Sequence, residues 1–472
     1  MAEKNADNLM EKIVALAKRR GFVYPGSEIY GGLANSYEYG PAGVELKRNI
    51  MNEWWRTFVQ GRADMVGLDS SIILHPRTWE ASGHVQGLTD SMVECRKCHT
   101  RTRADHLIEN HFEAKNESMS VEGRTEAELD AIIGDNKIKC PVCGALDWTP
   151  VRKFNLLFET HVGIVPESQS KVYLRGETAQ GIFVSFKNII DSTRVKLPFG
   201  VGQMGKSFRN EITKGNWVFR TLEFEQAEIE YFFDPEATEW KPLFEQWKEA
   251  MHAFVTGTLG VRAENLRWRE HGDDERSFYS KRTEDLEYKF PFGFKELWGL
   301  AYRTDYDLNQ HMKFSGIDLS YTDPATGRKF VPHVIEPAVG VNRLMAMAML
   351  ESYREEGDRV YLALPPRIAP YKAAVFPLLA NKPALVEAAR AIYDSLRKEF
   401  SVAWDDRGNI GKRYYAQDEI GTPFCITVDF DTLGEGGDEK KGTVTVRDRD
   451  TGAQERVEIT KLYEFLHGKI YR

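Results

Sequence analysis

Two pairs of cysteines have the spacing of metal ligands. Cys95 and Cys98 form one Cys-x-x-Cys pair, and Cys140 and Cys143 form a second pair, which is followed by a glycine. Each pair can present two thiolates to one ion, and four sulfur ligands satisfy tetrahedral zinc. Because the protein would then fill every coordination position, the predicted zinc is structural. The alternative is four reduced cysteines whose spacing is incidental.

A glycine-rich segment carries two phosphate-binding patterns. Residues 200–207 (GVGQMGKS) match both G-x-x-x-x-G-K-S and G-x-G-x-x-G. Both motifs need a strand before the glycines and a helix after them, because the phosphate binds at the helix N-terminus. The next residues lead to a Gly215-Asn216 turn without an amphipathic pattern, so we expect a strand here. A P-loop site that depends on Lys206 is kept as an alternative.

The segment after the glycines is predicted to form a strand hairpin. We expect antiparallel strands over Val201–Phe208 and Phe219–Phe233, joined by a loop at Lys214-Gly215-Asn216. Residues two apart on a strand share a face, so Arg209 and Glu211 are expected to point the same way.

One face of this hairpin combines groups that suit a nucleotide and an amine. Arg220, Phe224 and Glu228 are expected to share a face of the second strand, beside Arg209 and Glu211 of the first. Guanidinium groups pair with phosphate oxygens, an aromatic ring stacks on a purine, and carboxylates bind an ammonium or an exocyclic amine. A solvated face of salt bridges is the alternative, but it does not explain the phenylalanine among the charges.

The elements that must position these residues are a mixture of helices and strands. Residues 7–20 are predicted to form an opening helix, and Pro41 begins a second helix that Gly61 ends. An extended run follows from Met65 to Leu74. Short strands are expected to dominate from Phe154 to Phe233.

Polar segments divide the chain into parts. Residues 93–152, which contain the four paired cysteines, are predicted to be an insertion, and residues 236–290 are a possible second one. We expect a first domain over residues 1–350 and a polar linker at 351–358. Residues 359–472 alternate strand and helix patterns and are predicted to form an independent α/β domain.

The composition is that of a soluble globular protein. The chain has 472 residues, of which 42% are hydrophobic and 28% charged, and its formal net charge is −8. No apolar run is long enough to span a membrane, and the charged start is unlike a secretory signal. The paired cysteines favour a metal site over disulfides, which predicts a cytoplasmic protein. The acidic balance disfavours a protein that coats nucleic acid, but it does not exclude a tRNA partner.

Several segments together resemble class II aminoacyl-tRNA synthetases. FRNE at 208–211 with RTLEFEQAE at 220–228 resembles their second signature motif, and GVNR at 340–343 resembles the third. The helix that opens at Pro41 resembles the first motif, through which these enzymes form dimers. The finer resemblance is to glycyl-tRNA synthetases of the dimeric type. It rests on SGH (82–84), RADH (103–106), LRGETAQG (174–181), WGLAYRTDYDL (298–308), VIEPAVG (334–340) and RYYAQDEIGTPFCITVD (413–429).

The resemblance implies an α+β fold and an activity. The fold would be a class II synthetase-like antiparallel sheet with helices, a zinc-bearing insertion and a C-terminal α/β anticodon-binding domain. The protein would use ATP with Mg²⁺ to activate glycine as glycyl-adenylate, and would transfer the glycine to tRNA(Gly) as a homodimer that carries structural Zn²⁺. A non-catalytic, synthetase-like accessory protein that binds nucleic acid is an alternative.

The resemblance also assigns three catalytic residues. Arg209 would hold the α-phosphate, Glu211 would accept a hydrogen bond from the adenine amino group, and Arg343 would cover the purine and reach the γ-phosphate. The full set implied for ATP is Arg209, Asn210, Glu211, Phe219, Arg220, Thr221, Leu222, Glu223, Phe224, Glu296, Leu297, Gly340, Val341, Asn342 and Arg343.

The glycine pocket is implied to lie beside the nucleotide. Glu177 and Glu228 would receive the ammonium group, and Arg103 would close the pocket. Two residues depart from the family pattern, because Ala338 stands where serine is usual and Gly176 stands where proline is usual. The full set implied for glycine is Arg103, Glu177, Phe224, Glu225, Gln226, Ala227, Glu228, Glu336, Pro337, Ala338, Val339 and Gly340.

Overall fold

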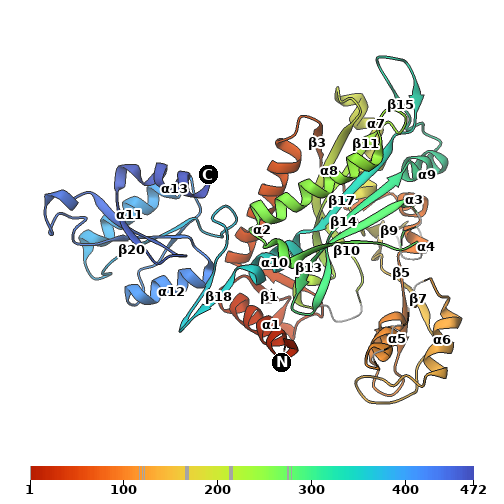
Figure 1. Ribbon diagram of the computed structural model, residues 1–472, viewed down its shortest axis with the longest axis horizontal. Coiled ribbons are helices and arrows are strands. Elements are labelled where there is room, and N and C mark those ends of the chain that lie inside the picture. Colours follow the sequence, from red (N-terminus) through yellow and green to blue (C-terminus); the bar gives the residue numbers. More distant parts are fainter. Residues whose placement is uncertain are drawn as a thin grey trace.

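The chain folds into three parts (Figure 1). A large central part holds the main sheet, a small part with α5 (Ala104–Glu113) and α6 (Glu126–Asp135) projects from one end, and the C-terminal part projects from the other. The computed structural model describes residues 2–471, except 116, 118, 120, 122, 165–169, 212–215, 274, 275 and 278.

Seven strands form the main sheet in the order β12-β13-β14-β17-β11-β10-β3. Neighbouring strands are antiparallel, except that β3 runs parallel to β10. The predicted mostly antiparallel sheet with helices is therefore confirmed. The strands are β3 (Met65–Leu68), β10 (Phe199–Phe208), β11 (Glu223–Phe233), β12 (Leu266–Glu270), β13 (Arg282–Phe290), β14 (Gly293–Thr304) and β17 (His333–Gly340).

Helices pack on both faces of this sheet. Side chains alternate along β11, so Ile229 and Tyr231 enter the larger hydrophobic core, whereas Phe232 enters a smaller core on the opposite face. The smaller core is covered by α7 (Ala179–Ser192) and α9 (Tyr306–Ser315). The larger core is covered by α1 (Ala2–Arg19), α2 (Pro41–Trp55), α8 (Trp240–Ala253) and α10 (Val341–Ser352).

Some local elements differ from the sequence prediction. The range 154–233 contains the helix α7, whose residues Ile182, Phe186 and Ile189 are buried at helical spacing. The opening helix begins at Ala2, several residues before the predicted start.

The predicted hairpin is displaced at its second strand. β11 begins at Glu223, because residues 217–219 form a 3₁₀ turn, so Arg220 precedes the strand instead of sharing a face with Phe224. Arg209 and Glu211 follow the end of β10. Residues 214 and 215 of the predicted loop lie outside the described part of the chain.

The glycine-rich segment is part of β10, as predicted. The described residues after it reach only a 3₁₀ turn before β11, so a phosphate has no helix N-terminus there. The glycines instead allow neighbours to approach closely. A Cβ atom on Gly202 would lie 2.6 Å from Val59 Cγ2, and one on Gly205 would lie 2.2 Å from Arg175 Nη2.

The cysteine-bearing segment has a core of its own. β5 (Thr89–Glu94) pairs with both β6 (Arg101–Arg103) and β7 (Arg152–Asn155), and α5 and α6 pack beside them around Ile108 and Leu129. The predicted limits 93 and 152 fall within β5 and β7.

Two other predicted segments differ from expectation. Residues 236–290 do not stand apart as a second insertion, because β12 and β13 extend the main sheet and α8 packs on the larger core. Some of their charged residues are themselves buried, among them Glu284, Asp285 and Glu287. Residues 351–358, predicted to be a polar linker, include β18 (Tyr353–Glu356), which pairs with β19 (Arg359–Leu362).

The C-terminal part has a five-stranded sheet in the order β21-β20-β22-β23-β24 and a separate hydrophobic core. It contacts the central part through the ion pair of Arg19 with Glu419, at 2.9 Å, and through Asn49 Nδ2, which donates to the Ala369 carbonyl at 2.9 Å. Its elements are β20 (Ala373–Pro377), α11 (Pro383–Leu396), β21 (Val402–Trp404), α12 (Ile410–Ile420), β22 (Phe424–Val428), β23 (Thr443–Asp448), β24 (Gln454–Glu458) and α13 (Leu462–Ile470).

Gly43 lies where α2 packs closely against the backbone at Phe22. A Cβ atom there would lie 1.9 Å from the carbonyl oxygen of Phe22. We expect Gly43→Ala to lower the free energy of unfolding by roughly 2 kcal/mol, since overpacking usually costs about 1–3 kcal/mol. Gly134→Ala on α6 is the matched control, because its Cβ would meet no atom within 4 Å. The control should gain about 0.5–1 kcal/mol from higher helix propensity. Equal denaturation midpoints for the two variants would contradict this view of Gly43.

Candidate active site

A cavity of about 340 Å³ opens on the sheet face that β11, β14 and β17 share. The register places Glu228 opposite Ala338, and Ala338 opposite Gly299. Residues two positions along each strand lie on the same face, so Gly340 and Ala301 continue this floor. Small side chains at these positions leave room above the sheet, whereas charged side chains stand at the ends.

Most of the predicted site residues line this cavity, although they come from distant segments of the chain. Those that line it are Glu177, Arg209, Glu211, Phe219, Arg220, Thr221, Phe224, Gln226, Glu228, Glu296, Glu336, Ala338, Val339, Gly340, Asn342 and Arg343.

The remaining predicted residues do not line the cavity, largely because side chains alternate along strands. Ala227, Leu297 and Val341 lie in the larger hydrophobic core, and Glu225 is ion-paired with Lys47 at 2.6 Å. The full set outside the lining is Arg103, Asn210, Leu222, Glu223, Glu225, Ala227, Leu297, Pro337 and Val341.

Arg103 lies in β6 of the cysteine-bearing part. Its guanidinium group is 3.0 Å from Asp90 and 2.5 Å from Asp105. Burial by itself would lower the pKa of Arg103. The carboxylates of Asp105, Asp90 and Glu211 raise this pKa by more than burial lowers it, so the net shift is upward. Because Glu211 lines the cavity, Arg103 is electrostatically coupled to the rim.

Two guanidinium groups and two aromatic rings stand at one end of the cavity. The Arg209 guanidinium carbon lies 5.6 Å from the centre of the Phe224 ring, and Arg209 Nε donates to the Gly176 carbonyl at 3.1 Å. The Arg343 guanidinium carbon lies 4.4 Å from the centre of the Phe219 ring. These planar groups can stack on a flat ligand and still offer N–H donors to anionic oxygens.

Carboxylates accompany these cations. The Glu296 carboxylate lies 2.9 Å from Arg343 Nη1, and this guanidinium group lowers the pKa of Glu296. Glu211 Oε2 is buried and accepts no hydrogen bond from the described residues; the nearest cationic atom of Arg220 is 3.8 Å away. A buried acceptor of this kind favours a ligand that brings an N–H donor.

Buried acids stand at the other end of the cavity. Arg303 is 1% exposed; its Nε donates to Asp307 at 2.8 Å, and its Nη1 contacts the Glu336 carboxylate. Burial alone would lower the pKa of Arg303, but Asp307 and Glu336 hold it well above the ordinary value. Arg303 therefore stays charged and balances part of the acidic cluster.

Glu177 and Glu228 have polar partners of their own. Burial would raise the pKa of Glu177, but His84 Nε2, at 3.0 Å, contributes most to a net lowering. Glu228 accepts hydrogen bonds from the Thr178 hydroxyl and, at 2.9 Å, from Gln226 Nε2. Both carboxyl groups are thus held in place at the cavity. Glu177 stays ionised, whereas burial, reinforced by the charges of Glu336 and Glu177, raises the pKa of Glu228 well above its ordinary value.

Sequence reasoning missed several lining residues. His271 and Tyr279 come from the connection between β12 and β13, and Asp285 comes from β13 itself, where no sequence pattern pointed to chemistry. The Arg303 guanidinium carbon lies 3.9 Å from the centre of the Tyr279 ring, and His271 Nε2 lies 2.8 Å from Asp285. The pairing of β13 with β12 and β14 brings this part of the chain to the cavity. Arg303 lay within a segment quoted for its family resemblance, but no role followed from it.

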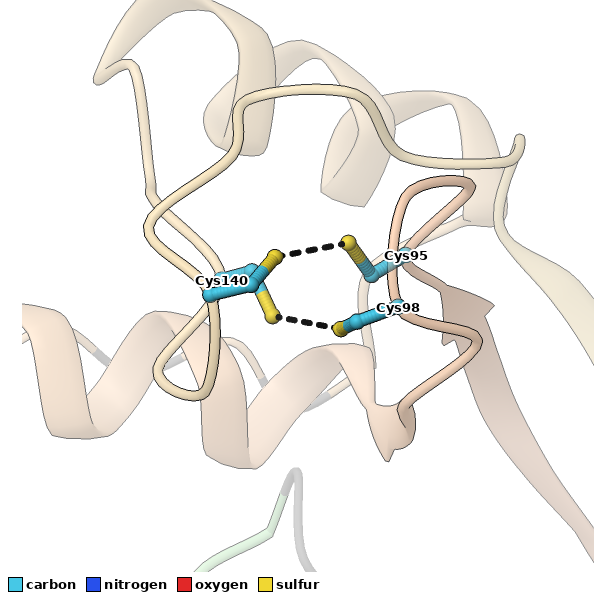
Figure 2. Close-up of side chains that lie close together, drawn as sticks. Cys95, Cys98 and Cys140 are labelled. Atoms are coloured by element: carbon cyan, nitrogen blue, oxygen red, sulfur yellow. Dashed lines mark hydrogen bonds between the residues drawn. The ribbon is translucent and has the colours of Figure 1, made fainter.

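The four paired cysteines converge in the small projecting part. Cys95 Sγ lies 3.6 Å from Cys143 Sγ, Cys98 Sγ lies 3.6 Å from Cys140 Sγ, and all four sulfurs lie within 4.8 Å of one another. Figure 2 shows Cys95 and Cys98 facing Cys140 across two loops. A tetrahedral zinc with bonds of about 2.3 Å would separate its sulfurs by roughly 3.8 Å. The donor set and its geometry therefore fit such an ion.

Comparison with known proteins identifies the family. Residues 159–353 match the family described as tRNA synthetase class II core domain (G, H, P, S and T), and residues 372–469 match anticodon binding domain. Residues 118–156 match glycyl-tRNA synthetase insertion domain 1.

Relatives match over nearly the whole chain. A glycine–tRNA ligase of Caldanaerobacter subterraneus subsp. tengcongensis is 52% identical over 98% of each chain. One of Geobacillus kaustophilus is 51% identical over 98% of this chain and 99% of its own, and one of Clostridium perfringens is 52% identical over 96% and 97%. The chain belongs to the glycine–tRNA ligase family.

The family resemblance seen in the sequence is thereby confirmed, as is the expected class II synthetase fold. The match to the class II core extends from 159 to 353 and includes β10, β11, β14 and β17, which carry most of the cavity. Within the described ranges, no helix of this glycine–tRNA ligase family member has the length and apolarity needed to cross a membrane.

Arg303→Met should destabilise the central part strongly. The substitution leaves the carboxylates of Asp307 and Glu336 buried without their cation, and breaking a buried ion pair on one side costs about 3–5 kcal/mol. Lys187→Met is the control, because Lys187 and Asp191 form an exposed pair whose side chains are 50% and 58% exposed. Such pairs contribute roughly 0–1 kcal/mol. Denaturant unfolding compares the two variants, and an Arg303→Met midpoint close to that of the wild type would contradict this role.

Proposed function

We propose that this chain attaches glycine to tRNA(Gly) in two steps. In the first step, an oxygen of the glycine carboxylate attacks the α-phosphorus of ATP, the bond to the pyrophosphate group breaks, and glycyl-adenylate forms. In the second step, a hydroxyl of the terminal ribose of tRNA attacks the carbonyl carbon, and AMP leaves. One observation carries this proposal: a single cavity holds guanidinium groups with aromatic rings at one end and buried carboxylates at the other.

The end of the cavity with Arg209 and Arg343 suits ATP. Phe224 and Arg343 are proposed to enclose the adenine, and the buried Oε2 of Glu211 would accept from its amino group. Arg209 would lie on the α-phosphate and Arg220 on the phosphate tail. No side chain acts as a nucleophile, so the rate enhancement would come from positioning and from stabilising charge on the α-phosphate.

Mg²⁺ is proposed to accompany the phosphates. Glu296 lines the cavity and about half of its side chain is exposed, so its carboxylate can face a bound cation. When bound, Mg²⁺ would neutralise charge on the phosphate oxygens.

The acidic end suits the ammonium group of glycine. Glu177, Glu228 and Glu336 line the cavity there and are 7%, 1% and 8% exposed. The smallest amino acid offers no side chain to bind, so the pocket must hold its charged groups and exclude larger ones by crowding. Ala338 forms part of the floor and supplies no hydroxyl, so the carboxylates and the wall beside the α-carbon would set the selectivity.

The other parts of the chain are proposed to serve tRNA and assembly. Residues 359–472 would bind the anticodon, which the family match at 372–469 supports. A homodimer is supported by three large apolar side chains near the first signature motif, Ile29, Tyr30 and Leu33, which are 88%, 87% and 61% exposed. Free cysteines grouped as metal ligands favour a cytoplasmic location.

Amino-acid-dependent exchange of pyrophosphate into ATP tests the proposed function. Glycine should support exchange and the other standard amino acids should not. Arg209→Ala should slow exchange by about 10²–10³-fold, by analogy with removal of one oxyanion-hole donor. Lys206→Ala is the control; Lys206 pairs with Glu223, and the two side chains are 43% and 44% exposed. Exchange with an amino acid other than glycine would overturn the assignment, and the opposite ranking of the variants would overturn the nucleotide site.

We also propose one structural zinc per chain, held by Cys95, Cys98, Cys140 and Cys143. Four thiolates leave no open position, so the ion would stabilise the small projecting part and take no part in the reaction. Elemental analysis should find one zinc equivalent in the wild type and much less in Cys140→Ser. Cys425→Ala is the matched control, because Cys425 is buried in β22, far from the cluster in sequence. Well under one equivalent in the wild type, or loss of zinc from the control alone, would contradict the site.

A further inference from the structure

Glu230 is a buried glutamate of β11 that has no role in the proposed reaction. The residue is 0% exposed and is absent from the lining of the cavity. Neither of its carboxyl oxygens accepts a hydrogen bond from any described residue. An ionised carboxylate buried in this way is strongly unfavourable.

The strand register brings Glu230 directly against the glycine pocket. β11 and β17 are antiparallel, with Glu228 opposite Ala338 and Tyr231 opposite Ile335, so Glu230 stands opposite Glu336. Carboxyl oxygens of Glu228, Glu230 and Glu336 lie within 4.8 Å of one another. Like charges directly opposite one another on a sheet destabilise it. Three ionised side chains in this cluster would therefore repel strongly.

The groups that face Glu230 offer little compensation. Beside Glu228 and Glu336, the charged groups that act on it are Arg303 and Asp307. Arg303 already donates to Asp307 and contacts Glu336. Burial, reinforced by the charge of Glu336, raises the pKa of Glu230 well above its ordinary value.

We propose that Glu230 is a positioning residue, which stays protonated and donates its O–H to the Glu336 carboxylate opposite it. This inference rests on the proposed function, because that function assigns Glu336 to the glycine ammonium. The neutral acid removes one negative charge from the cluster, and its hydrogen bond holds the Glu336 carboxylate in one orientation. Glu230 itself touches no substrate.

Two substitutions separate the hydrogen bond from the charge. Glu230→Gln keeps the shape and a donor without the charge, so the KM for glycine in pyrophosphate exchange should stay within about threefold of the wild type. Glu230→Met keeps the approximate length but removes the donor, so this KM should rise about tenfold or more while the KM for ATP stays nearly unchanged. If Glu230 had only a structural role, we would not expect glutamine to restore the KM for glycine, and we would not expect the change in KM to be confined to glycine.

Infrared difference spectroscopy reads the proton directly in the full-length protein. At neutral pH the spectrum of the wild type minus that of Glu230→Gln should contain the carbonyl stretch of a protonated carboxyl group. Burial also raises the pKa of Glu228 and of Glu336, so the test is the difference between the two proteins and not the presence of a band in either one. Glu284→Gln is the matched control, since Glu284 is 3% exposed but ion-paired with Lys248 at 2.7 Å. Removing this ionised group should leave the protonated band in place.

The possible outcomes distinguish failure of the proposed role of Glu230 from failure of the proposed function. The proposal is wrong if Glu230→Gln loses glycine activity as severely as Glu230→Met. It is also wrong if the wild-type spectrum minus that of Glu230→Gln contains no protonated carboxyl band, because Glu230 is then ionised. Wild-type KM for glycine in both variants would show that Glu230 positions nothing. If the wild type itself fails to exchange pyrophosphate with glycine, the proposed function fails instead, and the infrared band still tests the proton on Glu230.

Discussion

The register of β11 against β17, and of β17 against β14, is the constraint on which the site depends. It aligns Glu228 with Ala338 and Gly299, and it sets which side chains of all three strands face the cavity. A slip of one residue would send the acids into the larger hydrophobic core and turn Ile229 toward the cavity. The helices over the larger core oppose such a slip, because each strand buries apolar side chains on the face away from the cavity.

Charge balance is the second constraint, and it follows from the first. Aligned strands crowd acids at one end of the cavity, where burial weakens screening and strengthens every repulsion. Arg303, which enters from β14, offsets part of this charge through Asp307 and Glu336. Hydrogen bonds from Thr178 and Gln226 hold Glu228. The residual negative charge makes this end attractive to a small cation and unattractive to an anion.

The opposite end of the cavity is formed by cationic and aromatic side chains. Arg209 and Arg343 lie against aromatic rings, which orients their planar guanidinium groups while leaving N–H donors available. The two ends of the cavity thus differ in the sign of their charge. Two ligands that carry a phosphate and an ammonium group can therefore bind side by side in only one orientation, with the phosphate at the arginines and the ammonium at the acids. The cysteine-bearing part and the C-terminal part have separate hydrophobic cores, so neither is needed to build this polarity.

The sequence by itself determined the local chemistry. The paired cysteines, the segment around Arg209 and the strand nature of 200–207 follow from spacing and residue type, because such signals act over a few residues. Arg343 followed from the resemblance to a known family. Only the tertiary structure decided that 236–290 belongs to the main sheet, that Tyr279 lines the cavity with Arg303 against its ring, and that Glu230 stands opposite Glu336. These outcomes depend on pairing between strands far apart in the chain, and a single sequence carries no local signal for register between distant strands.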